Sequence, residues 1–265
     1  MTGALPTMVV VGAMKCGTSA LHAYLDAHPD IAMAATKEAN FFFGSGQPPA
    51  GPENTWWREG QWHRGAGWYA DQFDEACRVR GESSPGYTDP SHPEVPARMA
   101  VLLPAVRLVY LVRDPVDRAV SQYRHHARDG SERRPIEEAL LDPESQYLAR
   151  SRHHERIEPF LEHFAREQLL VVVQERMLAD RRGQLSRVFR HVGADPDFWD
   201  PAHLARVHVG EGADQELPAG LRREFWGRVR DDVDRLRELV GEELEEWQDP
   251  GERVVGARRV AGGRA

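Results

Sequence analysis

Residues 7–28, TMVVVGAMKCGTSALHAYLDAH, place a β-branched apolar run, a glycine-containing loop and a helical pattern in direct succession. The run 7–12 is typical of a buried parallel strand. Apolar residues then recur at helical spacing from Thr18 until Pro29 ends the pattern. A strand, a loop and a helix in this order suit an anion, because backbone N–H groups and the positive helix N-terminus point into the loop.

The loop between this strand and this helix contains several donors suited to a phosphate group. Gly17 lets the backbone approach a ligand closely, and Lys15 adds a full positive charge. Thr18 and Ser19 add hydroxyls at the start of the helix. The G-x-x-x-x-G-K-[ST] loop of nucleoside triphosphate enzymes has its lysine where this chain has Thr18. The loop therefore predicts a phosphate site of another kind, the alternative being a plain turn without a ligand.

A second candidate anion site follows another buried strand, VRLVYLV at residues 106–112. Arg113 stands at its carboxyl end, Asp114 suits the cap of a new helix, and Ser121 lies about two turns along that helix. An arginine and a hydroxyl together suit a phosphate dianion, since the guanidinium offers a planar fork of donors. Other arginines of this helix are expected to form a solvated, ion-paired face: Arg118, Arg124 and Arg128.

The rest of the chain alternates apolar runs with helical patterns, which predicts a three-layer α/β fold with a central, mostly parallel sheet flanked by helices. Ligands of such sheets bind beyond the carboxyl ends of the strands, where both candidate anion sites lie. We expect a single domain over residues 1–248 and a loose C-terminal tail over 249–265. The expected strands span 7–12, 31 onward, 78–82, 106–112 and 169–173. The expected helices span 18–28, 96–103, 115 onward, 136–141, 145–164, 181–192 and 218–247.

The composition is that of an ordinary globular protein. Its 265 residues are 41% hydrophobic, and the net charge of −8 argues against a general nucleic-acid binder. Two cysteines cannot form a disulfide framework, and no apolar run approaches the ~20 residues of a membrane span. We therefore expect a cytoplasmic protein without a signal peptide, a nucleic-acid partner or a membrane partner. The histidine pairs at 125–126 and 153–154 lack the spacing of a helical zinc site, so we also expect no metal.

Several stretches resemble the sulfotransferases that use 3'-phosphoadenosine 5'-phosphosulfate, above all the heparan sulfate glucosaminyl branch and its bacterial relatives. KCGTSAL, residues 15–21, resembles the loop that binds the 5'-phosphosulfate. LVRDPVDRAVSQY, residues 111–123, resembles the 3'-phosphate site. KEANFF, residues 37–42, resembles the segment that carries the catalytic glutamate. The resemblance covers residues 8–247, and the two phosphate motifs are specific in this order and spacing.

The resemblance implies a P-loop-like sulfotransferase fold and a bacterial enzyme that needs no metal. It implies in-line transfer of a sulfuryl group from 3'-phosphoadenosine 5'-phosphosulfate to a hydroxyl or amine of a small-molecule or carbohydrate acceptor, with adenosine 3',5'-bisphosphate as product. Glu38 would be the general base, and Lys15 would stabilise the charge on the leaving phosphate. The implied cofactor-binding residues are Lys15, Cys16, Gly17, Thr18, Ser19, Arg113 and Ser121.

The acceptor site is less well marked than the phosphate sites. Lys37 is a candidate for holding the sulfonate, and His92 is a second candidate base. Trp56 and Trp57 lie in an irregular stretch, residues 44–66, where they would either stack on a flat acceptor or anchor the stretch to the core.

Neighbouring residues and departures from the family pattern add further expectations. The phenylalanines at 41–43 are expected to bury Glu38 and raise its pKa. Ser83 stands where the related branch usually has a lysine, and its basic C-terminal loop has no clear match at 207–216. The alternative functions are a P-loop nucleotide kinase and a non-catalytic nucleotide-binding module of the same fold.

Overall fold

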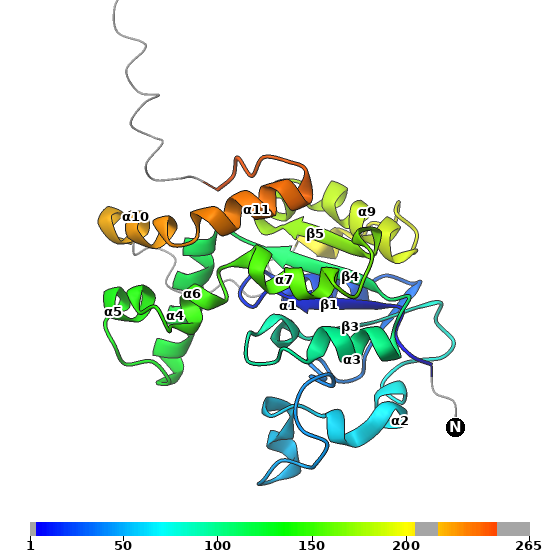
Figure 1. Cartoon of the computed structure of the whole chain (residues 1–265). Helices are drawn as coiled ribbons and strands as arrows, with labels where there is room; N and C mark the ends of the chain where they lie inside the picture. The colour runs from blue at the N-terminus through cyan, green and yellow to red at the C-terminus, as the bar shows by residue number, and fades with distance from the viewer. Residues whose placement is uncertain (1–3, 205–216, 248–265) are drawn as a thin grey trace, which may run out of the picture. The chain divides into compact units, whose positions relative to one another are not determined.

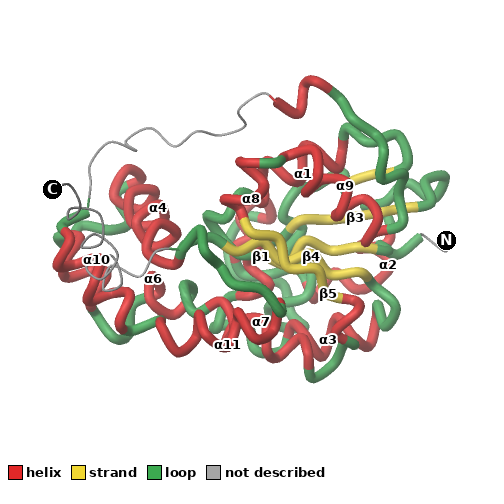
Figure 2. The backbone as a smooth tube through the Cα atoms, turned by 90° about the horizontal axis from the view of Figure 1, so that it is seen from above, coloured by secondary structure: helices red, strands yellow, loops and turns green. Residues whose placement is uncertain are grey.

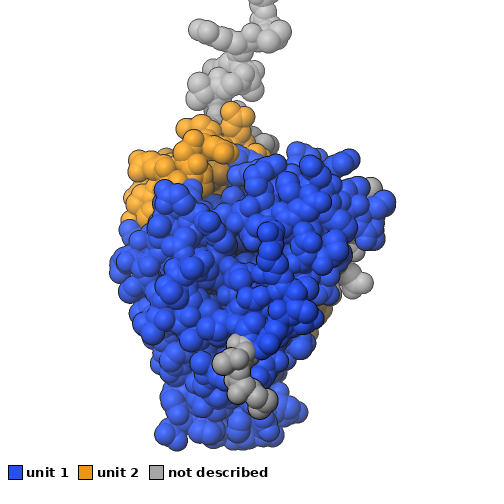
Figure 3. Space-filling model, turned by 90° about the vertical axis from the view of Figure 1, so that its right-hand side faces the viewer, with its two compact units in different colours: residues 1–113, 155–209 blue, residues 114–154, 210–265 orange. Residues whose placement is uncertain are grey.

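The computed structural model describes residues 4–204 and 217–247. The chain divides into two compact units, drawn blue and orange in Figure 3. Unit 1 comprises residues 1–113 and 155–209 and contains the sheet, whereas unit 2 comprises residues 114–154 and 210–265 and is built of helices. The single domain expected over 1–248 stays a prediction, and the expected tail at 249–265 lies outside the described residues.

The centre of unit 1 is a five-stranded parallel sheet with the strand order β2-β3-β1-β4-β5 (Figure 1). Val10 in the central strand lies opposite Ser83 on one side and Val109 on the other. The strands are rich in β-branched residues, and all five positions of β1 are buried, as expected for a strand covered on both faces. The strands are β1 Met8–Gly12, β2 Ile31–Met33, β3 Val79–Ser83, β4 Arg107–Val112 and β5 Leu169–Val173.

Helices cover both faces of this sheet, which confirms the predicted three-layer α/β fold. Figure 2 shows α1, α8 and α9 on one face and α3 and α7 on the other. The chain leaves β1 toward one edge of the sheet through α1 and leaves β3 toward the other edge through α3. The loops after β1 and β4 therefore lie where ligands bind in such sheets, at the point where the winding reverses. These helices are α1 Thr18–Asp26, α3 Val95–Leu102, α7 His153–Leu161, α8 Gln174–Ala179 and α9 Arg181–Val192.

Short irregular elements connect β2 to β3 and follow β3. They include the irregular stretch expected at residues 44–66, which forms two 3-10 turns and the beginning of a short helix. The elements of this region are η1 Glu53–Arg58, η2 Trp62–Arg64, α2 Gly65–Ala70 and, after β3, η3 Pro85–Thr88. Two further 3-10 turns of unit 1 are η4 Arg166–Gln168 and η5 Pro201–Leu204.

Unit 2 contains the helices α4 Pro115–Asp129, α5 Ile136–Leu141, α6 Gln146–Ala149, α10 Ala219–Gly227 and α11 Arg230–Val240. The expectation of one helix over 218–247 is wrong, because the chain turns between α10 and α11. Phe225 and Val233 are buried on either side of the turn, so the apolar spacing gives no sign of it. The helix expected over 145–164 is also two helices, α6 and α7.

Arg118 corrects another expectation, that of a solvated helix face. Its side chain is fully buried in unit 2. The guanidinium donates hydrogen bonds to Ser151 Oγ, Gln122 Oε1 and the carbonyl of Tyr147, at 2.7–2.8 Å. A buried guanidinium needs several acceptors, and those at Tyr147 and Ser151 hold α4 to α6 and to the residues just after it. Arg128, by contrast, is exposed as expected.

Candidate active site

The loop between β1 and α1, residues 12–17, is the Gly17 loop. Gly17 has φ +91° directly before α1, a conformation that L side chains rarely adopt. A Cβ atom at this position would also lie 3.4 Å from Gln174 Nε2. The carbonyl of Gly17 accepts the N–H groups of Ala20 and Leu21, so α1 begins at this glycine. The first N–H groups of a helix have no partner within it and face the loop, as a phosphate requires.

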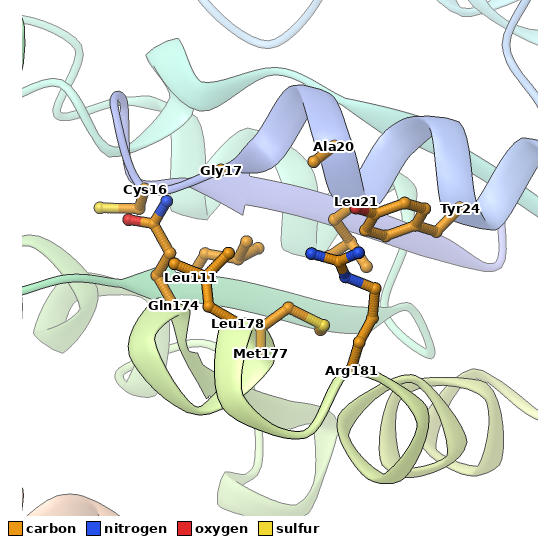
Figure 4. Close-up of a pocket in the computed structure, with 10 residues that line it drawn as sticks. All are labelled: Cys16, Gly17, Ala20, Leu21, Tyr24, Leu111, Gln174, Met177, Leu178 and Arg181. Atoms are coloured by element: carbon orange, nitrogen blue, oxygen red, sulfur yellow. The ribbon is translucent and has the colours of Figure 1, made fainter. Parts of the chain in front are cut away.

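A cavity of about 40 Å³ lies beside the Gly17 loop. Figure 4 shows its walls, which come from the loop and α1 on one side and from α8 and Arg181 on the other. Gln174 borders it, and the Oε1 atom of that side chain is buried without a hydrogen-bond partner among the described residues. Cys16 also borders it and is fully buried, with Sγ 3.9 Å from the carbonyl of Met14. An unpaired buried acceptor beside an anion loop favours a ligand that brings its own donor.

Arg113 lies at the carboxyl end of β4, where its guanidinium reaches the Gly17 loop. Its Nη1 lies 3.5 Å from the carbonyl oxygen of Lys15. Two of the predicted cofactor residues, 98 positions apart in the chain, are thus brought together. Ser121, the other residue of the predicted second anion site, lies half-buried on α4 in unit 2.

Residues 37–41, here called the Glu38 segment, meet the start of α1. Lys37 Nζ donates a 2.8 Å hydrogen bond to Ser19 Oγ and lies 3.4 Å from Glu38 Oε1. Lys37 therefore connects the candidate base, Glu38, to Ser19 in the first turn of α1. The backbone N–H of Glu38 donates to the carbonyl of Ser83 at 3.2 Å, which ties the segment to the end of β3.

The expected burial of Glu38 is not found. Its side chain is 35% exposed, whereas Phe41, Phe42 and Phe43 are buried. Glu38 and Asn40 have φ +58° and +48°, so the backbone turns twice between the carboxylate and the phenylalanines. The aromatic rings enter the core, and the carboxylate stays at the surface.

The proposed acceptor residues lie in different surroundings. Trp56 packs within its own stretch: its Nε1 donates to the carbonyl of Gly51, and the Arg64 guanidinium lies 5.4 Å from its ring. Trp57 is 42% exposed, and its carbonyl accepts a 2.8 Å hydrogen bond from the side chain of Asn40. His92 stacks on Phe43 at 3.9 Å between ring centroids. Of these residues, Trp57 combines an exposed side chain with a backbone carbonyl that is hydrogen-bonded to the Glu38 segment.

His22 is a residue near this site that the sequence interpretation missed. Its Nδ1 lies 3.2 Å from Ser83 Oγ, and Ser83 is the residue whose carbonyl holds Glu38. Burial lowers the pKa of the His22 imidazole, and the nearby Lys37 ammonium lowers it further, against the opposing effect of Asp26. The sequence signal that could have identified His22 is its position one helical turn after Ser19, on the same face of α1.

Residues 4–204 and 217–247 contain no group of three or more His, Cys, Asp or Glu side chains arranged to hold a metal ion. Within the same residues, no helix has the length and apolar character needed to cross a membrane. The region 207–216, where a basic loop was sought, lies outside the part of the chain that the structure describes.

The comparison with known families agrees with this geometry. Residues 6–201 match a family described as the sulfotransferase family. The chain belongs to this sulfotransferase family. The resemblance stated from the phosphate loop, the Arg113 stretch and the Glu38 segment is thereby confirmed at the level of the family.

The curated relatives of this chain include proteins that are named as heparan sulfate sulfotransferases. Mouse heparan sulfate glucosamine 3-O-sulfotransferase 3B1 is 29% identical over 199 residues, which are 71% of this chain and 46% of that protein. Human bifunctional heparan sulfate N-deacetylase/N-sulfotransferase 2 is 24% identical over 211 residues, 72% of this chain and 22% of that protein. The chain thus spans less than half the length of these curated relatives.

Solved sulfotransferase structures confirm the fold. A sulfotransferase from Alicyclobacillus acidocaldarius is 30% identical with a TM-score of 0.75, over 92% of this chain and 99% of that one. The sulfotransferase domain of the Synechococcus PCC 7002 olefin synthase is 16% identical with a TM-score of 0.56, over 92% and 97% of the two chains. The second likeness concerns the fold alone.

Proposed function

We propose that the chain transfers a sulfuryl group from 3'-phosphoadenosine 5'-phosphosulfate to a hydroxyl or amine of a carbohydrate, with Glu38 as general base. The observation that carries this proposal is the junction at Lys37, which lies 2.8 Å from Ser19 Oγ and 3.4 Å from Glu38 Oε1. A base beside a phosphate loop suits an acceptor that attacks a group held on that phosphate.

The residues of the Gly17 loop fit the proposed nucleotide. Gly17 leaves room where a Cβ would contact Gln174, and the buried Gln174 Oε1 suits a hydroxyl or amino group of the nucleoside rather than a phosphate oxygen. Lys15 and the first N–H groups of α1 would hold the phosphate that carries the sulfuryl group, and Arg113 and Ser121 the phosphate on the ribose. When bound, the nucleotide supplies the sulfuryl group and a phosphate leaving group.

The proposed reaction divides the chemical work between two groups of residues. The acceptor oxygen or nitrogen forms its bond to sulfur as the bond between sulfur and the bridging phosphate oxygen breaks, and the acceptor proton passes to the Glu38 carboxylate. Lys15 and the N–H groups at the start of α1 stabilise the negative charge left on the phosphate. Lys37, held by Ser19, lies where it would stabilise the sulfonate oxygens.

The carbohydrate class of the acceptor is supported by two observations. Two relatives are named for heparan sulfate, which is a carbohydrate. Trp57 offers an exposed indole, and its backbone carbonyl is hydrogen-bonded to Asn40 of the Glu38 segment. Aromatic faces commonly pack on flat ligands. The net charge of −8 favours a short acceptor over a long polyanion.

Calorimetry and a transfer assay test the proposed function together. We expect adenosine 3',5'-bisphosphate to bind with micromolar affinity, about tenfold or more tighter than adenosine diphosphate, which lacks the 3'-phosphate. The labelled donor should then transfer its sulfuryl group to members of a carbohydrate panel. Lys15→Ala should weaken both binding and transfer, whereas the exposed Arg190→Ala should change neither. Absence of bisphosphate binding would reject the proposal, and a preference for ATP with Mg²⁺ would favour a kinase instead.

A further inference from the structure

A carboxylate lies fully buried at the carboxyl end of β3, next to the central strand. Glu82 Oε1 accepts hydrogen bonds from the hydroxyls of Tyr69 and Tyr87, at 2.5 and 2.7 Å. Its Oε2 accepts one from Ser84 Oγ at 2.8 Å. Burial raises the pKa of Glu82, while these three hydroxyl donors act in the opposite direction. A buried carboxylate is costly unless its oxygens accept hydrogen bonds, and these three hydroxyls supply them.

Two of these hydroxyls also hold the backbone of the Glu38 segment. Tyr87 Oη accepts the N–H of Phe41 at 3.0 Å, and Ser84 Oγ accepts the N–H of Asn40 at 3.2 Å. Two consecutive amides are thus linked, each through one hydroxyl, to the two oxygens of one carboxylate. Because an ionised carboxylate only accepts hydrogen bonds, Glu82 directs both hydroxyl protons toward itself and leaves the hydroxyl oxygens to accept from the amides.

The Glu38 segment needs such external support. Glu38 and Asn40 adopt positive φ values that are unfavourable for residues other than glycine, and such conformations persist where the surroundings fix them. The amide of Glu38 is fixed by the carbonyl of Ser83, and the amides of residues 40 and 41 by the hydroxyls on Glu82. The end of β3 therefore holds three amides of a five-residue segment.

We propose that Glu82 is a positioning residue for sulfuryl transfer, which orients the hydroxyls of Ser84 and Tyr87 so that the Glu38 carboxylate stays beside Lys37 and Ser19. The inference rests on the proposed role of Glu38 as the base. A displacement of about 1 Å in a reacting group costs on the order of 100-fold in rate, so the support of the segment should be visible in turnover.

Tyr87→Phe and Tyr69→Phe form a matched pair that tests this inference. Each variant removes one hydroxyl that donates to Glu82 Oε1, and each keeps a buried aromatic ring. The Tyr87 hydroxyl also holds the amide of Phe41. We expect Tyr87→Phe to lower kcat by about tenfold or more and Tyr69→Phe by less than about threefold, with the KM for the donor unchanged in both.

Amide hydrogen exchange supplies a readout that does not depend on activity. Peptides covering residues 38–43 should exchange faster in Tyr87→Phe and in Ser84→Ala than in Tyr69→Phe. Equal kcat and equal exchange in Tyr87→Phe and Tyr69→Phe would overturn the positioning role. If the unmodified protein binds no bisphosphate and transfers no sulfuryl group, the proposed function fails, and unequal exchange would still show that the hydroxyls support the segment.

Glu82→Gln tests the carboxylate itself. The amide keeps the shape of the side chain but replaces one acceptor by an NH₂ donor, so one of the two hydroxyl links loses its acceptor. We expect kcat to fall at least as far as in Tyr87→Phe, with bisphosphate affinity within about threefold of the unmodified protein. A folded Glu82→Gln protein that retains full kcat would contradict the inference.

Discussion

The Gly17 loop and the Glu38 segment lie next to each other but owe their shapes to different interactions. The loop depends chiefly on local backbone geometry, with a glycine at φ +91° directly before a helix, in addition to the contact from Arg113 to the carbonyl of Lys15. The segment is set by distant side chains, since its amides at 40 and 41 bond to hydroxyls 44 and 46 residues further along the chain. Local backbone geometry forms the proposed phosphate site, whereas a buried polar cluster positions the proposed base.

This difference predicts that binding and turnover can be impaired separately. Substitutions at the Gly17 loop and at Arg113 should weaken the nucleotide complex. Substitutions in the Glu38 segment, or in the hydroxyls that hold it, should leave that complex intact and slow the transfer. The predictions below test this separation.

The largest effect is expected from Glu38→Gln. The amide cannot accept the acceptor proton, so kcat should fall by about 10²–10⁴ while bisphosphate affinity changes by less than about threefold. Steady-state transfer and calorimetry on the same preparation measure both quantities. Glu75→Gln, at an exposed carboxylate outside the site, is the control. If Glu38→Gln lowered the affinity for the bisphosphate as well as kcat, Glu38 would belong with the residues that bind the nucleotide.

Arg113→Ala should give the converse result. Loss of a charge-assisted contact to phosphate costs about 2 kcal/mol, which is about 30-fold in the affinity for adenosine 3',5'-bisphosphate. Affinity for adenosine diphosphate should change much less, because that nucleotide has no 3'-phosphate. Arg190→Ala removes an exposed arginine on α9 and serves as the control. Equal losses for both nucleotides would show that Arg113 does not recognise the 3'-phosphate.

Trp57→Ala tests whether Trp57 contacts the acceptor. Loss of an exposed aromatic platform should raise the KM for the acceptor by about fivefold, with the KM for the donor unchanged. Trp57→Phe should recover part of this affinity. Trp56→Ala should instead lower the melting temperature, because Trp56 is packed by Arg64. An unchanged acceptor KM in Trp57→Ala would remove this residue from the acceptor site.

The smallest effect is expected from a substitution of His22, a residue of α1 that contacts Ser83 at the end of β3. Its pKa is lowered by burial, so the unfolded chain binds the proton more readily and stability is lost as the pH falls below about 6.5. His22→Gln should lessen the drop in melting temperature between about pH 7.5 and 5.5 by about 1–3 °C. The exposed His163→Gln should leave that drop as it is. An equal drop in both variants would contradict the account of His22.

Much of the fold was predictable from the sequence because its signals are local. The strands at 107–112 and 169–173 and the helices at 136–141 and 181–192 follow from apolar runs and caps within each segment. The break between α10 and α11 was not predictable, because buried residues continue at helical spacing on both sides of it.

The candidate site shows the same limit. The Gly17 loop and Arg113 were predictable because each directly follows a strand end. The residues of the Glu82 cluster, Tyr69, Glu82, Ser84 and Tyr87, lie in two stretches, 67–69 and 82–87, that also resemble the related branch. Their role was not predictable, since these side chains meet only when β3 and the Glu38 segment pack together. Glu38 was found through resemblance, but its exposure depends on two backbone turns that carry no local sequence signal.

The most direct test of the central proposal is a crystal structure of the complex with adenosine 3',5'-bisphosphate. We expect the 5'-phosphate against the N–H groups at the start of α1 and beside Lys15, and the 3'-phosphate within hydrogen-bond distance of Arg113. The 5'-phosphate should also face the Glu38 carboxylate. A nucleotide bound away from the Gly17 loop, or one whose 3'-phosphate lies out of reach of Arg113, would contradict the account.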